Sequence, residues 1–159
     1  MTAPVTSYMP WALLAVLAVL LGKAAVSDFK ARLISNRLNL TIAVLAPLYW
    51  WSVGLPIWSV GVQLGLAAGV FAAFAALFYL GGMGGGDVKL AAALALWFAP
   101  RELLQLILLM SVVGAPITLA AWADHRRSAA AGRVKVPYGI AIAVGAGSIL
   151  AERYLNQFG

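Results

Sequence analysis

Cysteine is absent from this chain of 159 residues, histidine occurs once, and only five residues are acidic. Without cysteine the chain cannot form disulfide bonds, use a thiol nucleophile or bind zinc or iron through thiolates. The single histidine, His125, excludes a histidine-rich metal site and makes a Ser/His/Asp triad difficult to build.

Charged residues of both signs are also scarce. They make up 10% of the sequence and hydrophobic residues 64%, whereas about a quarter of a typical soluble chain is charged. A soluble domain of this size could not bury so much apolar surface, so we expect an integral membrane protein with a single domain over residues 1–159. The net charge is +6, but basic residues in membrane proteins mark cytoplasmic loops, and nucleic acid is not an expected partner.

Six apolar segments predict an all-α, polytopic transmembrane helical bundle. A membrane-spanning helix needs about 20 apolar residues, and the second, fourth and sixth segments are short by this measure. The fourth is so short that its helix either begins inside the preceding glycine run or ends at a thinned, water-accessible depth of the membrane. The predicted spans cover residues 10–26, 38–51, 55–80, 88–100, 103–123 and 137–150.

Basic residues predict the orientation of these spans. All of the eleven except Arg101 and Arg153 lie in or beside the first, third and fifth connections. Because positive charge concentrates in cytoplasmic loops, we expect these three connections in the cytoplasm and both termini on the extracytoplasmic side. The basic residues that carry the argument are Lys23, Lys30, Arg32, Arg37, Lys89, Arg126, Arg127, Arg133 and Lys135.

Small residues recur at every fourth position in two of the segments. This spacing lets helix backbones approach closely within lipid, so we expect both faces to pack against other helices. The residues are Gly61, Gly65 and Gly69 in the third segment, and Gly139, Ala143 and Gly147 in the sixth.

The five acidic residues fall into two groups. Glu102, Asp124 and Glu152 lie beside basic residues near the ends of predicted spans, where solvated interfacial charges explain them. Asp28 and Asp87 instead adjoin apolar segments directly. Asp28 has two open interpretations at this point: an interfacial carboxylate balanced by the basic residues that follow it, or a functional group.

Asp87 closes a run of glycines at residues 81–86 that is interrupted only by Met83. Glycine is unfavourable in a helix, and irregular backbone at membrane depth is tolerated only where protein buries it or water fills a cavity. A glycine-rich hinge with Asp87 capping the fourth helix is one interpretation. The other is a substrate-accessible site.

The predicted topology places Asp28 and Asp87 at the same membrane face. Two carboxyl groups brought together do not both ionise readily and share a proton. One of them can then deprotonate a water molecule while the other protonates a leaving nitrogen. This pair of roles is the chemistry of an aspartic protease, and the glycines would let a peptide lie close to the backbone.

Three segments carry a resemblance to known families. Residues 84–87 (Gly-Gly-Gly-Asp) match the Gly-x-Gly-Asp signature of membrane-embedded aspartic proteases, and residues 81–90 resemble the type IV prepilin peptidase family in particular. Asp28 followed by Ile34 and Asn36 is similar to that family's first catalytic segment. Residues 136–141 (Val-Pro-Tyr-Gly-Ile-Ala) resemble the short peptidases of tight-adherence, or Flp-type, pilus systems.

The resemblance implies an endopeptidase of the bacterial inner membrane that cuts the basic leader from prepilins or pseudopilins at the cytoplasmic face, just after a glycine. It implies Asp28 and Asp87 as the catalytic pair, Gly84 and Gly86 as the residues that shape the loop, and neither metal nor cofactor. Larger members also carry a cytoplasmic loop, often with zinc-binding cysteines, and methylate the new N-terminus. This chain has a short first connection and no cysteine, so we expect cleavage without methyl transfer.

Three further residues are candidate supporting residues, each with two open interpretations. Asn36 either caps the second helix or orients Asp28. Lys89 either holds one carboxylate ionised or anchors the chain at the cytoplasmic interface. Tyr138 is either an interfacial aromatic anchor or a contact at the active-site cleft.

Two other classes of function compete with a peptidase. A small ion-coupled transporter would use the same aspartates as proton or cation sites, although the sequence contains no repeated half and both acids are expected at one face. A non-catalytic component of a pilus or secretion assembly would tolerate asparagine at both positions. Ion flux without peptide cleavage would indicate the transporter.

Overall fold

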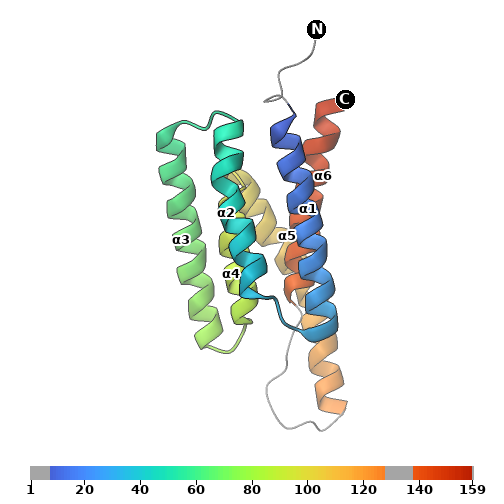
Figure 1. The fold of residues 1–159 in the computed structure, drawn as a ribbon. Helices are drawn as coiled ribbons and strands as arrows, with labels where there is room; N and C mark the ends of the chain where they lie inside the picture. The colour runs from blue at the N-terminus through green and yellow to red at the C-terminus, as the bar shows by residue number, and fades with distance from the viewer. Residues whose placement is uncertain (1–7, 128–137, 159) are drawn as a thin grey trace.

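Six α-helices make up the part of the chain that the structure, a computed structural model, describes: residues 8–127 and 138–158 (Figure 1). No strand occurs among these residues, as the sequence predicts. The helices are α1 (Met9–Ala31), α2 (Asn36–Ser52), α3 (Ile57–Tyr79), α4 (Gly85–Ala95), α5 (Pro100–Arg127) and α6 (Tyr138–Phe158).

Each helix coincides with one predicted segment, but several boundaries differ. Helix α1 continues to Ala31, beyond the predicted end at residue 26, because its last turns place the polar side chain of Asp28 inward among other helices. Helix α4 begins at Gly85, so the first of the two alternatives for the short segment, a start inside the glycine run, is confirmed. Helices α5 and α6 extend about one to two turns beyond their predicted ends. The first residue of the sixth predicted span, Pro137, lies outside the described residues.

Among the described residues, three helices are long and apolar enough to cross a membrane: α1, α3 and the part of α5 from Pro100 to Ala120. Helix α4 has only 11 residues, or about 16 Å of helix against a hydrocarbon core of about 30 Å. That α2, α4 and α6 also span the membrane stays a prediction.

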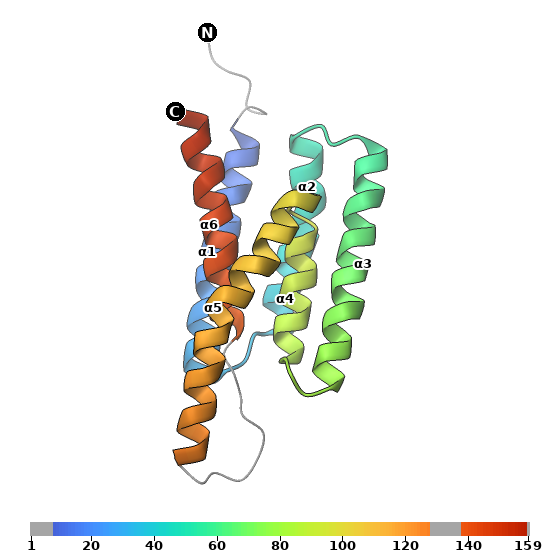
Figure 2. The same ribbon diagram turned by 180° about the vertical axis from the view of Figure 1, so that it is seen from behind.

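The helices run so that both ends of the described chain lie at one end of the bundle (Figure 1 and Figure 2). The α1–α2 and α3–α4 connections lie at the opposite end, together with the last turns of α5 and the first turn of α6. An even number of helices that alternate in direction produces this arrangement. Arg133 and Lys135 of the predicted basic connection lie outside the described residues.

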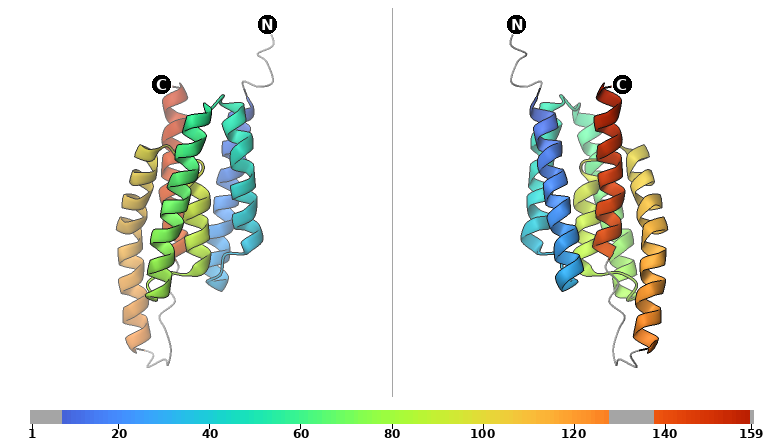
Figure 3. Two further views of the ribbon diagram at one scale, coloured as in Figure 1. Left: turned by 90° about the vertical axis from the view of Figure 1, so that its left-hand side faces the viewer. Right: turned by 90° about the vertical axis from the view of Figure 1, so that its right-hand side faces the viewer.

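Helix α4 occupies the centre of the bundle, which explains why so short a helix is stable. It packs against α2, α3 and α6, and most of its residues are buried. Two tryptophan side chains tie its C-terminal end to α2: Trp97 donates to the carbonyl of Ile42 at 2.9 Å, and Trp50 donates to that of Leu96 at 2.7 Å. Helix α5 packs along α6 at the edge of the bundle (Figure 3).

The predicted packing face of the third segment is wrong for the described chain. Side chains added at Gly61, Gly65 or Gly69 would meet no atom within 4 Å. Helix α3 instead packs on α4 through its other side, where Gln63 and Val70 are buried. Small residues at every fourth position permit close packing of two helices, but they do not require it. In α3 the face that carries Gln63 and Val70 is the one that α4 covers.

The interpretation of Glu102 as a solvated charge is also wrong. Its carboxylate forms an ion pair with Arg153 of α6, and the Arg153 guanidinium also donates to the carbonyl of Trp97 and to the Tyr49 hydroxyl, each at 3.2 Å. This arginine therefore connects α2, the end of α4, α5 and α6 at the end of the bundle opposite the aspartates. In the sequence, Glu102 follows a basic residue and Arg153 follows an acidic one. The sequence does not show that Glu102 and Arg153, which lie on different helices, pair with each other.

Candidate active site

Asp28 lies one turn before the end of α1 and is 3% exposed. The helix ends just beyond it because Arg32 adopts a left-handed conformation (φ 49°) and donates its N–H to the Asp28 carbonyl at 2.8 Å. The Asp28 carboxylate accepts a hydrogen bond from the backbone N–H of Ile140 in the first turn of α6, at 3.2 Å. The aspartate is therefore held by backbone far along the chain and is not an exposed interfacial charge.

Asp87 lies in the first turn of α4 and is 5% exposed. Gly84 is the N-cap of this helix, and the Asp87 carboxylate accepts a hydrogen bond from the Gly84 backbone N–H. This is the backward bond of a capping box, in which an acid at the third helical position satisfies the N–H of the cap residue. A Cβ at Gly84 would lie 2.6 Å from Asp87 Oδ2, so a glycine is needed there.

The two carboxyl groups converge at the backbone of Gly139. Its N–H is within hydrogen-bonding reach of both Asp28 and Asp87, and the two carboxyl groups also interact electrostatically with each other. A Cβ at Gly139 would lie 2.8 Å from Asp28 Oδ2. Helices α1 and α4 each pack against α2 and α6, so α6 brings the carboxyl groups together by placing its first turn between them.

One oxygen of Asp87 is left without a protein partner. Its Oδ1 is buried and accepts no hydrogen bond from the described residues. Buried polar atoms are nearly always paired, and an unpaired one needs an explanation such as a catalytic role or a bound water. Two buried, neighbouring carboxyl groups with one free oxygen are chemically equipped for general acid–base catalysis.

Gly86 is a second position of the glycine run at which the backbone approaches another segment closely. A Cβ at Gly86 would lie 3.1 Å from the carbonyl oxygen of Ile34 and 3.2 Å from its Cβ. The α1–α2 connection therefore packs directly on the start of α4. This contact explains why a glycine precedes Asp87. That Gly84 and Gly86 shape an active-site loop stays a prediction.

A comparison of the sequence with known families assigns the family of the chain. A sequence model of the type IV leader peptidase family matches residues 15–119, well over half of the chain. The chain belongs to the type IV leader peptidase family. The match includes both Asp28 and Asp87. No curated protein sequence and no solved structure matches the chain.

In this leader peptidase family member, the hydrogen bonds of the three candidate supporting residues go to groups other than the two carboxylates. The N-cap of α2 is Ser35, which accepts from the N–H of Leu38, and not Asn36 as the capping interpretation had it. Asn36 Oδ1 instead accepts a hydrogen bond from the Lys89 ammonium at 2.8 Å. Lys89 lies two residues after Asp87 and so projects from the other side of α4.

Tyr138 contacts α5. Its hydroxyl is hydrogen-bonded to Thr118 at 3.1 Å, and its ring lies against Gly114, where a Cβ would be 2.9 Å away. The ring also lines a cavity of about 230 Å³ together with Gly82 and Met83 of the glycine run. Tyr138 therefore fixes the start of α6, which carries the amides of Gly139 and Ile140, and borders a cavity beside the glycine run.

Asn39 is the residue of this site that the sequence interpretation missed. It is 4% exposed, and its side-chain amide donates to the carbonyl oxygen of Gly86 at 3.0 Å. It therefore fixes the peptide group that precedes Asp87. A signal was present in the sequence, because an asparagine between Leu38 and Leu40 in an apolar segment needs a buried hydrogen-bond partner.

Replacement of Asn39 by leucine is expected to lower kcat for peptide cleavage by about tenfold, since an unpaired carbonyl at Gly86 costs roughly 1–3 kcal/mol and frees the loop. The Michaelis constant should change little, because Asn39 positions Asp87 and not the substrate. Gln63→Leu is the matched control: it removes another buried amide, from α3, and should leave cleavage kinetics unchanged. Equal kinetics for the Asn39 and Gln63 variants would contradict the positioning role.

Proposed function

We propose that this leader peptidase family member is a membrane-embedded aspartic endopeptidase with Asp28 and Asp87 as its catalytic pair. Its substrates are prepilins or pseudopilins, whose basic leaders it removes at the cytoplasmic face of the bacterial inner membrane. The observation that supports this most strongly is the convergence of two buried carboxyl groups, from α1 and α4, on the Gly139 amide. The family assignment supports a protease independently.

The pair acts as one unit in the proposed mechanism. One carboxylate takes a proton from a water molecule, whose oxygen attacks the carbonyl carbon of the scissile peptide bond. The other carboxyl group hydrogen-bonds the carbonyl oxygen, which carries negative charge in the tetrahedral intermediate. As the C–N bond breaks, a carboxyl group delivers a proton to the leaving nitrogen. Because the two groups interact, their protonation states belong to the pair and not to either residue.

The glycine run is the proposed approach path of the substrate. Gly82 and Met83 border the cavity of about 230 Å³ beside Tyr138, and Gly84 directly precedes the turn that carries Asp87. Backbone without side chains lets an extended peptide lie close to the carboxyl groups. The apolar helix of an inserted prepilin would keep the cleavage site at the membrane surface, where this end of the bundle is expected to lie.

Two finer features of the proposed function concern the choice of prepilin and the fate of its new N-terminus. The segment around Tyr138 and Gly139 supports an Flp-like prepilin as substrate. Methyl transfer to the new N-terminus is not expected, because the connection between α1 and α2 contains only a few residues and the chain has no cysteine for a zinc-binding loop.

Co-expression with a prepilin tests the proposed function directly. An Flp-type prepilin should be converted to the shorter mature form in cells that lack their own leader peptidase. Mass spectrometry of the mature N-terminus should show a cut after glycine and no added methyl group. An uncleaved prepilin, with both proteins present in the membrane, would contradict the peptidase assignment, and a methylated product would contradict cleavage alone.

A further inference from the structure

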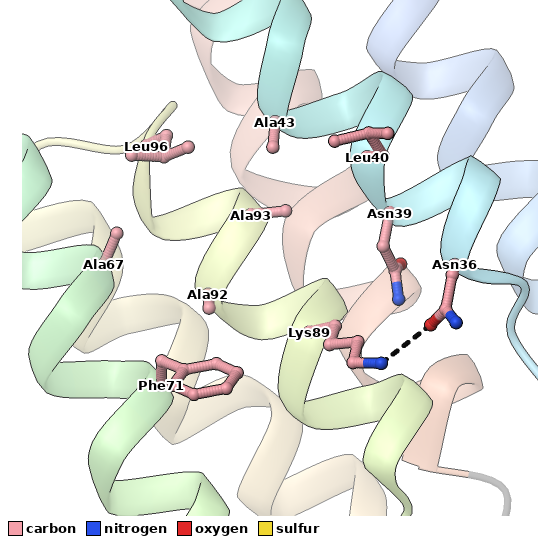
Figure 4. Close-up of a pocket in the computed structure, with 10 residues that line it drawn as sticks. All are labelled: Asn36, Asn39, Leu40, Ala43, Ala67, Phe71, Lys89, Ala92, Ala93 and Leu96. Carbon is pink, nitrogen blue, oxygen red and sulfur yellow. Dashed lines mark hydrogen bonds between the residues drawn. The ribbon is translucent and has the colours of Figure 1, made fainter.

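A groove lies on the surface of α4 (Figure 4). Its lining residues Lys89 and Ala92 project from the side of the helix opposite to Asp87. The groove has a volume of about 470 Å³, within the range of about 300–1,000 Å³ of small-molecule sites, and α2, α3 and α4 line it. Its floor is formed by Ala92, Ala93 and Leu96 of α4, and Phe71 of α3 lines one wall. The groove is open because α2 and α3 each pack against α4 and leave its surface between them uncovered.

The two ends of this groove differ in chemistry. Nearly all of its lining is apolar, but the ammonium group of Lys89 and the amides of Asn36 and Asn39 gather at one end (Figure 4). This end lies beside the start of α4, which carries Asp87. Lys89 is exposed and donates to Asn36, and it forms no ion pair within the described part of the chain. A cation at one end of an apolar groove is complementary to an anionic amphiphile.

Asn39 connects the polar end of the groove to the loop before Asp87. Its Nδ2 is used by the Gly86 carbonyl, but its Oδ1 is buried and has no donor among the described residues. Because that oxygen is covered by protein, the polar contact that the groove offers to a ligand is the exposed Lys89 ammonium.

The length of the groove discriminates between two apolar occupants. From Lys89 to Leu96 the groove extends about 10 Å along the helix axis, at 1.5 Å for each residue. A membrane-spanning helix needs contact over a hydrocarbon core of about 30 Å, whereas the acyl chains of one leaflet occupy about half of that. The groove therefore fits a lipid of one leaflet better than a transmembrane helix.

We propose that this groove binds one anionic phospholipid, such as phosphatidylglycerol. An acyl chain lies along Ala92, Ala93 and Leu96, and the phosphate lies at the Lys89 ammonium. Basic pockets between helices at the cytoplasmic side are suited to anionic headgroups. The bound lipid would link α2, α3 and α4 at the level where Asn39 fixes the loop before Asp87, so the active site and the membrane composition would be coupled.

Native mass spectrometry of the purified full-length protein tests this proposal without any substrate. The delipidated protein is incubated with dioleoyl phosphatidylglycerol or dioleoyl phosphatidylcholine, and the lipid-bound fraction is measured. Phosphatidylglycerol should be retained about fivefold better, because one lysine near a headgroup contributes roughly this factor. Lys89→Gln should remove the preference. Lys30→Gln is the matched control, since it removes an exposed lysine from the same end of the bundle and should preserve the preference.

A second variant locates the lipid in the groove. Ala92→Phe places a large side chain on the groove floor and should lower retention of both lipids, with an unchanged elution profile. Equal retention of the two lipids by the wild-type protein would overturn the proposal, as would an equal loss of preference in the Lys30 and Lys89 variants. Photo-cross-linking of a prepilin helix at position 92, with lipid retention unaffected by Ala92→Phe, would assign the groove to the substrate instead.

Discussion

Asparagine in place of Asp28 or Asp87 is expected to slow prepilin cleavage by about 100- to 10,000-fold, the range that a positioned general acid or base contributes. The amide has nearly the shape of the carboxyl group, and its oxygen still accepts a hydrogen bond from Ile140 at position 28 or from Gly84 at position 87. It cannot exchange a proton with water or with the leaving nitrogen. The fold should therefore remain while the chemistry is lost.

The double variant sharpens this prediction. Residues that act as a unit are not additive in their effects on rate, so the variant with both asparagines should be no slower than the slower single variant. Initial cleavage rates of a purified prepilin in detergent, at equal peptidase concentration, measure all three. Asp124→Asn serves as the control, because it neutralises another aspartate to which the proposed mechanism gives no role, and it should retain the wild-type rate. A wild-type rate in either single variant would contradict the catalytic pair.

The sequence was informative about helices because apolar segments and their interruptions are local features. The run of glycines before Asp87 predicted a break, and α4 begins inside it. The sequence was less informative about where α1 ends, because Ser27 and Asp28 look like an interface when read alone. In the structure these residues continue the helix, since Asp28 meets the backbone of α6. A polar residue ends a membrane helix only if nothing inside the bundle binds it.

The contacts that hold groups from distant helices together were beyond reach of the sequence, although the predicted topology and the family resemblance indicated Asp28 and Asp87 as a pair. Asp28 and Asp87 could be selected because each adjoins an apolar segment. The residue that joins them, Gly139, appeared only in a packing pattern and in the segment that resembles the Flp-type peptidases. Arg153 and Glu102 likewise each had a nearer partner of opposite charge in sequence. In each case the contact depends on how α6 packs against its neighbours, which a pattern within one helix does not contain.

Gly139 should therefore be nearly as sensitive as the aspartates. Gly139→Ala places a Cβ 2.8 Å from Asp28 Oδ2 and 2.7 Å from Ile34 Cδ1, so the carboxyl group must rotate away from its place beside Asp87. A displacement of about 1 Å in an active site can cost about 100-fold in rate, and we expect a loss of this size in kcat. Helix α6 should remain folded, because alanine is more favourable than glycine in a helix by roughly 1 kcal/mol.

Gly147→Ala is the matched control for this prediction. It makes the same substitution in the same helix, at a position where a Cβ meets no atom within 4 Å, and it should retain the wild-type cleavage rate. A further variant separates the two contacts of the new methyl group. Adding Ile34→Ala to Gly139→Ala removes the Ile34 contact but leaves the carboxyl contact. If displacement of Asp28 causes the loss, this double variant stays inactive, whereas restored cleavage would assign the effect of Gly139→Ala to packing against Ile34.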